Sequence, residues 1–144
     1  MKIKSDFVTN SSSSSFVMIG TSNPRVISDY LKFLLWSKVS SHEILEKVFK
    51  NGEVNEEDFG EFAELYEKHF DEQDYAIYQT GDLTHCFSFE NENLGEMGLG
   101  LQHMLVEENL NFEQMKEKVK EKFETAGVKI NDNDINYLEF EHYG

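Results

Sequence analysis

His85 and Cys86 are the adjacent residues best suited to chemistry, because a thiol with a nearby imidazole base can act as a nucleophile. They lie in a predicted strand, residues 83–90, in which neighbouring side chains point to opposite faces. The two side chains therefore cannot pair, and a base for Cys86 would have to be His69 or His103. We expect Cys86 to be buried and His85 to be a hydrogen-bonded imidazole in the core or at an interface. No catalytic residue is predicted.

The segment that follows the second predicted helix matches half of a calcium-binding loop. Gly52, Val54 and Asp58 fit positions six, eight and twelve of an EF-hand. Positions one and three would be Lys47 and Phe49, whose side chains provide no oxygen ligand. The segment is therefore predicted to join two helices, and no metal site is assigned.

Two further patterns fall short of a ligand site. Three glycines match neither a phosphate loop nor a dinucleotide fingerprint, and no lysine directly follows them; they are Gly95, Gly98 and Gly100. A histidine and two carboxylates near the end of the third helix suit a weak cation, but such clusters arise by chance where acids are dense; they are His69, Asp71 and Asp74. No cofactor is predicted.

Negative charge is the strongest signal in the sequence. The chain has 13 Lys and Arg against 28 Asp and Glu, a formal net charge of −15. Residues 1–50 carry a net +3 and residues 51–144 a net −18, with no Lys or Arg between Lys68 and Lys116. A field of this sign repels nucleic-acid phosphates and attracts a basic protein surface. Direct nucleic-acid binding is therefore not expected, although excess acid also serves solubility alone.

Four helices are predicted from capping residues and apolar spacing. The first follows Asn23 and runs to residue 38, and its apolar residues cover nearly every side. This helix is therefore central or meets a partner, and its candidate apolar interface is Leu31, Leu35 and Trp36. Capping boxes predict the starts of the second and fourth helices; they are Ser40 with Glu43 and Asn111 with Gln114.

The third predicted helix carries the acidic residues. Asn55 is its expected N-cap, and Phe59, Phe62 and Tyr66 have the spacing of an inward face. The opposite face is the candidate binding surface, here called the acidic face; it consists of Glu53, Glu56, Glu57, Glu61, Glu64 and Glu67. A protein partner with a basic surface is the ligand that this charge favours.

Strands are predicted from four apolar segments. These are residues 16–19, 75–80 and 83–90 and a C-terminal pattern from 135 to 140. Gly81 and Asp82 have the spacing of a two-residue hairpin, and residues 71–74 are expected to form a turn. Residues 99–106 fit a strand or a short helix equally well.

A serine-rich string, KIKSDFVTNSSSSSF, forms residues 2–16. It resembles an N-terminal signature of small uncharacterised proteins of Gram-positive bacteria and their phages. The resemblance implies a bacterial or mobile-element origin and brings with it no activity and no functional residue. From the residues themselves, Ser11–Ser15 are expected to form a hydroxyl-rich loop, either simply solvated or open to an anion or a modification.

Cysteine usage and hydropathy indicate the compartment. The single cysteine allows no intrachain disulfide and fits a reducing cytosol. No apolar run approaches the roughly 20 residues of a membrane helix, and Asp6 and the serines stand where a signal peptide would be apolar. A cytoplasmic protein without membrane contact is predicted.

The whole sequence predicts one α+β domain over residues 1–144, with a Ser-rich start at 1–15. A mixed or antiparallel sheet of about four or five strands is expected, covered by about four helices. The leading hypothesis is a small acidic protein-interaction module, such as a phage or mobile-element accessory protein, that binds a basic partner surface. The alternatives are a small enzyme using His85, Cys86 and His103, and a subunit that associates with copies of itself.

Overall fold

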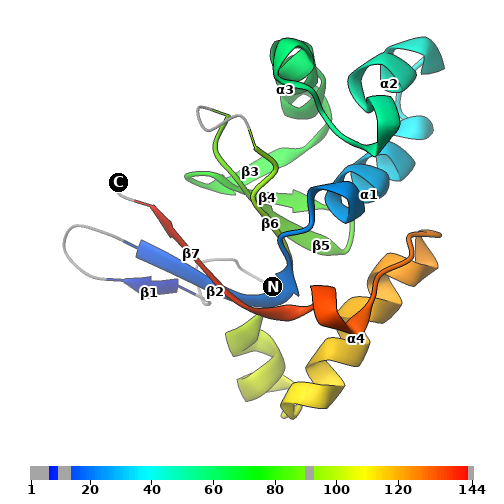
Figure 1. Ribbon diagram of the computed structural model, residues 1–144. Coiled ribbons are helices and arrows are strands. Elements are labelled where there is room, and N and C mark those ends of the chain that lie inside the picture. The colour runs from blue at the N-terminus through cyan, green and yellow to red at the C-terminus, as the bar shows by residue number, and fades with distance from the viewer. Residues whose placement is uncertain (1–6, 10–13, 90–92, 143–144) are drawn as a thin grey trace.

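In the computed structural model the chain forms one antiparallel sheet with helices packed against it (Figure 1). The structure describes residues 7–9, 14–89 and 93–142. Within these residues the sheet has seven strands: β1 (Phe7–Thr9), β2 (Ser14–Thr21), β3 (Asp71–Asp74), β4 (Ile77–Thr80), β5 (Leu83–Cys86), β6 (Glu96–Gly100) and β7 (Asn136–His142). The α+β class and the antiparallel option are confirmed, with more strands than expected.

β2 connects the two halves of the sheet. The strand order is β1-β2-β6-β5-β4-β3, and β7 pairs with β2 along residues 14–20. Because β7 occupies one edge of β2, β1 and β6 share the other edge. β2 and β6 pack closest at Gly20 and Gly98, where a Cβ on either glycine would lie 2.2 Å from a backbone oxygen of the other strand. Gly98 therefore serves this close contact rather than a ligand.

The four α-helices are α1 (Pro24–Trp36), α2 (His42–Val48), α3 (Phe59–His69) and α4 (Phe112–Thr125). Two predicted starts are confirmed. The Asn23 side chain accepts a hydrogen bond from the Arg25 N–H at 3.0 Å, with Pro24 at the first helical position. Asn111 and Gln114 form both hydrogen bonds of a capping box. Local sequence therefore determines where α1 and α4 begin.

The predicted caps of α2 and α3 are wrong. α2 begins one residue later than expected, with Ser41 as N-cap, so Glu43 stands at the second helical position and cannot complete the box with Ser40. A 3₁₀ turn, Glu56–Asp58, precedes α3, and the Asn55 side chain forms no capping hydrogen bond. Instead the Asn55 carbonyl accepts from the Asp58 N–H at 3.0 Å, as 3₁₀ geometry requires.

The central hairpins are shifted from their predicted positions. Residues 71–74, expected as a turn, form the edge strand β3, and the turn lies at Tyr75 and Ala76, whose φ is 61°. Asp and Glu have low strand propensity, so pairing with β4 decides this segment. The two-residue hairpin at Gly81 is confirmed, because Thr80 pairs with Leu83. Residues 99–106 contain both alternatives, the end of β6 and a π-helical turn at His103–Glu107.

Two apolar clusters lie on the two faces of the sheet. The larger contains residues of all four α-helices and includes Leu83 and Phe87. The smaller consists of Phe16, Met18, Ile77 and Cys86, with Leu138 and Phe140 packed against it. The predicted alternation around Cys86 is thus confirmed. Among the described residues, no helix is both long and apolar enough to cross a membrane.

Candidate functional site

The inner side of α3 is a cluster of aromatic rings that holds this helix on the sheet. Phe62 and Tyr66 are fully buried. The Tyr66 ring lies 4.8 Å from that of Phe87 and 4.9 Å from that of Tyr78, at the interplanar angles of edge-to-face contacts. Phe62 meets Phe49, just beyond α2, at 5.8 Å. Because these contacts fix the rotation of α3, the opposite side of the helix faces solvent.

Only part of the acidic face lies on α3 as predicted: Glu61, Glu64 and Glu67 are on the helix, whereas Glu56 and Glu57 are in the 3₁₀ turn and Glu53 precedes it. Five of its glutamates are exposed: Glu53, Glu56, Glu57, Glu64 and Glu67. Glu61 is half-buried and accepts a hydrogen bond from the Lys47 ammonium at 2.8 Å, which raises the pKa of Lys47. The pair joins α2 to α3 at the surface, where such ion pairs contribute little stability. Most of the acidic face is thus open to solvent.

The edge strand β3 extends the acidic face, and sequence reasoning missed this extension. Asp71 and Glu72 are exposed on β3. The pKa of Tyr78 on β4 is raised, first by burial and then by the carboxylates of Glu72 and Glu67. Carboxylates from both β3 and α3 therefore contribute to the shift at this one phenol. Residues 53–74 contain ten carboxylates and one lysine, Lys68.

Part of the charge on β3 has a local structural role. The Glu72 carboxylate accepts the Ala76 N–H at 3.0 Å, and the Asp74 carboxylate accepts the Tyr75 N–H at 2.7 Å. These bonds stabilise the turn between β3 and β4. Charged side chains on an edge strand also discourage pairing with another chain. The carboxylates of α3 have no such role in the backbone, so they are the better candidates for binding.

His85 is a core residue, as expected. Its side chain is fully buried between two hydrogen-bond partners: Nε2–H donates to the Leu94 carbonyl at 2.6 Å, and Nδ1 accepts from the Tyr66 hydroxyl at 2.7 Å. Burial lowers the pKa of His85 to about 4, and the bond to Leu94 opposes that shift. A neutral imidazole with both nitrogens occupied positions α3 on the sheet and leaves no nitrogen for a substrate.

Two residues of the enzymatic alternative, His85 and Cys86, lie on opposite faces of the sheet. Cys86 is fully buried on the other face of the sheet, and burial raises the pKa of its thiol well above the usual value. A thiol of this kind is protonated near neutral pH and is a poor nucleophile. His103 lies in the π-helical turn, 2.7 Å from the Glu107 carboxylate. His85 and Cys86 therefore form no nucleophile–base pair.

The other ligand patterns have structural explanations. Gly52 has a φ of 74° in the joint between α2 and α3, and Val54 packs against the core. Asp71 and Asp74 lie on β3, beyond the end of α3. The pKa of His69 is lowered by partial burial and by Lys68 and Lys38. Within the described residues, no three His, Cys, Asp or Glu side chains are grouped as metal ligands.

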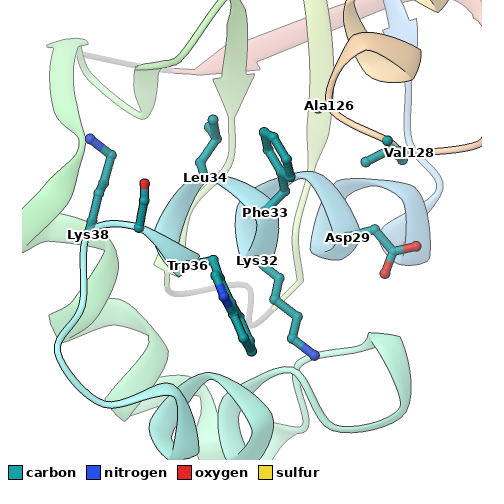
Figure 2. A pocket seen from close by; sticks show the side chains of 10 residues that line it. Asp29, Lys32, Phe33, Leu34, Trp36, Lys38, Ala126 and Val128 are labelled. Atoms are coloured by element: carbon teal, nitrogen blue, oxygen red, sulfur yellow. The ribbon is translucent and has the colours of Figure 1, made fainter.

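The apolar side of α1 differs from the prediction. Leu31 and Leu35 are fully buried in the core, so they cannot contact a partner. The exposed apolar residues of α1 are Phe33 (52% exposed) and Trp36 (42% exposed). They line a hollow of about 700 Å³ between α1 and the turn after α4 (Figure 2), here called the α1 groove; its apolar lining is Phe33, Leu34, Trp36, Ala126 and Val128.

Trp36 is held in place at the rim of the α1 groove. Its ring stacks on His42 with centroids 3.8 Å apart, and His42 Nε2–H donates to the Trp36 carbonyl at 2.8 Å. The Lys32 ammonium lies 5.9 Å from the Trp36 ring and 3.2 Å from the Glu46 carboxylate. Periodicity alone missed Phe33 because α1 is apolar on nearly every side, which hides the side that the fold leaves exposed.

Comparison with known proteins adds no relative. No family model, no curated protein and no solved structure matches the chain significantly. What the protein does has to be inferred from its own residues.

Proposed function

We propose that this protein is a small protein-interaction module whose acidic face binds a basic surface of a partner protein. The observation that carries the proposal is the density of carboxylates over residues 53–74, ten against one lysine, on α3 and on the segments that flank it. A bacterial or phage origin, which the N-terminal string implies, suits an accessory protein that occupies the surface of a host or phage component.

Rigidity and charge together favour binding over solubility alone. Scattered carboxylates keep a protein soluble, whereas carboxylates on one rigid surface create a field that steers a complementary partner. The part of the acidic face that lies on α3 is preorganised, because Phe62 and Tyr66 fix this helix on the sheet and only the glutamate side chains have to be ordered on binding. Its partner is a basic protein, since nucleic-acid phosphates would be repelled.

The test compares partners captured by two variants of equal net charge. In the first, four exposed residues of the acidic face are reversed: Glu56→Lys, Glu57→Lys, Glu64→Lys and Glu67→Lys. Glu61 is left in place because it pairs with Lys47. In the control, four exposed glutamates of α4 are reversed: Glu113→Lys, Glu117→Lys, Glu121→Lys and Glu124→Lys. The tagged proteins are used as bait in bacterial lysate, and captured proteins are identified by mass spectrometry.

We expect a basic protein to be captured by the native chain and by the α4 variant, to be lost with the acidic-face variant, and to elute with salt. The purified partner should then bind the acidic-face variant at least about tenfold more weakly, as loss of several rim charges implies. Partners retained within about twofold by the acidic-face variant would contradict the proposal. Circular dichroism of both variants shows whether they fold.

A further inference from the structure

The α1 groove combines exposed aromatic rings with charges at its two ends. Figure 2 shows Lys38 at one end and Asp29 at the other, with Phe33, Leu34 and Trp36 between them. Asp29 and Lys38 are both exposed. Lys32, in the middle, is paired with Glu46. The groove therefore has an apolar centre with one negative and one positive end.

This pattern is complementary to itself when two copies of α1 pack antiparallel. At 1.5 Å per residue, Asp29 lies about 6 Å before Phe33 along the axis of α1, and Lys38 lies just beyond the C-cap, Ser37, at the other end. If Phe33 sits near a two-fold axis, Asp29 of one copy faces Lys38 of the other, and the contact occurs twice. Such symmetric interfaces use the same patch on both subunits, as the commonest dimers do.

From this geometry we infer that the α1 groove is the contact surface of a homodimer. The two Phe33 rings pack at the centre beside Leu34 and Trp36, and two Asp29–Lys38 ion pairs close the ends. This interface shares Trp36 with the sequence-based hypothesis of self-association, but it uses Phe33 in place of the buried Leu31 and Leu35. It is independent of the acidic face.

The charge of the whole molecule selects this side for contact between copies. Residues 24–50 carry five basic and three acidic residues, whereas the rest of the chain is strongly negative. Two copies of a protein with a net charge of −15 repel each other least where basic residues gather. In Figure 1, α1 lies between α3 and the C-terminal end of α4, so a dimer joined through α1 leaves the outer side of α3 open. Two acidic faces in one particle would raise avidity for a repetitive partner.

Sedimentation equilibrium of the full chain tests the dimer. At physiological salt we expect a reversible monomer–dimer equilibrium when the protein concentration is varied from about 1 to 200 µM. A modest interface has its dissociation constant in this range. Phe33→Ser should weaken dimerisation at least about tenfold, since it removes the central apolar contact. Phe112→Ser is the matched control, because Phe112 is 46% exposed and lies at the start of α4. Along the helix axis this is about 20 Å from Ala126, where α4 reaches the α1 groove. This control should leave the equilibrium unchanged.

Charge swaps test the antiparallel arrangement. Asp29→Lys and Lys38→Asp should each weaken the homodimer, because each places like charges together at both ends. Asp29→Lys reduces the net negative charge, so weaker association cannot come from general repulsion. An equimolar mixture of the two variants should form a heterodimer, since opposite charges meet again at both ends.

Three results would overturn the inference. They are a monomer at every concentration, an unchanged equilibrium in Phe33→Ser, and a mixture of charge-swap variants that stays monomeric. Circular dichroism confirms that each variant folds, as expected for exposed positions. None of these results bears on the acidic face, whose partner is scored separately in the lysate experiment.

Discussion

α3 and α1 pack on the same sheet and differ in what they present to solvent. Both bury an apolar side in the larger cluster, through residues such as Phe62 of α3 and Leu31 of α1. On the outside, α3 carries carboxylates, while α1 exposes Phe33 and Trp36. One scaffold thus holds a charged surface, which acts over distance and weakens with salt, beside an apolar surface, which acts only on contact.

The largest expected effect is the difference in stability between a substitution on the inner side of α3 and one on the outer side of α1. Phe62→Ala should lower the free energy of unfolding by about 3–5 kcal/mol, because it empties a fully buried aromatic site. Phe33→Ala, the same substitution at a position that is 52% exposed, should change it by no more than about 0.5 kcal/mol in the monomer. Urea denaturation at low protein concentration measures both.

Similar losses for the two variants would mean that Phe33 belongs to the core, and the α1 groove would then not be available for contact. A small loss for Phe62→Ala would show that the aromatic cluster does not hold α3, and the acidic face would lose its rigid support.

Acid should weaken the attachment of α3 through His85. The pKa of this imidazole is about 4 in the folded protein and about 6.5 when exposed, so the unfolded chain binds the proton more readily. The contribution of neutral His85 to the free energy of unfolding is therefore fully present above about pH 6.5. It declines as the pH falls towards 4, by up to about 3 kcal/mol. Urea denaturation across this pH range gives the slope of the free energy of unfolding against pH.

His85→Asn is the control for this slope. The variant should be less stable at neutral pH, because asparagine cannot reach both Tyr66 and Leu94, but it should lose the dependence between pH 6.5 and 4 that the imidazole causes. A slope equal to that of the native protein would assign the acid sensitivity to other groups.

The smallest effect concerns the ion pair on the outer side of α3. Lys47→Ala removes the partner of Glu61 at the surface and should lower the free energy of unfolding far less than Phe62→Ala does, with the difference shrinking in high salt. If Lys47→Ala destabilised the protein as much as Phe62→Ala, the outer side of α3 would be structural, and the acidic face would have a simpler explanation than binding.

Elements with a strong local signal were predicted well. α1 and α4 begin at the expected caps, and the hairpin at Gly81 has the expected pairing. Errors fall where long-range contacts override local preference. β3 has the composition of a turn and becomes a strand only because β4 pairs with it. The opposite faces of His85 and Cys86 followed from alternation alone, because strand geometry fixes that relation locally.

The candidate surfaces show the same division. The acidic face was predictable because its glutamates stand opposite an aromatic stripe at helical spacing. The exposed side of α1 was not, because Leu31, Phe33, Leu35 and Trp36 are equally apolar in sequence and only packing against the sheet buries two of them.

The sequence by itself determined the charge, the helix caps, the hairpin and the outward side of α3, since each depends on residues close together in the chain. Tertiary structure decided the strand order around β2, the conversion of residues 71–74 into an edge strand, and the exposure of Phe33 beside the turn after α4. These features depend on contacts between distant segments, whose energies are set by burial and pairing that no local pattern records.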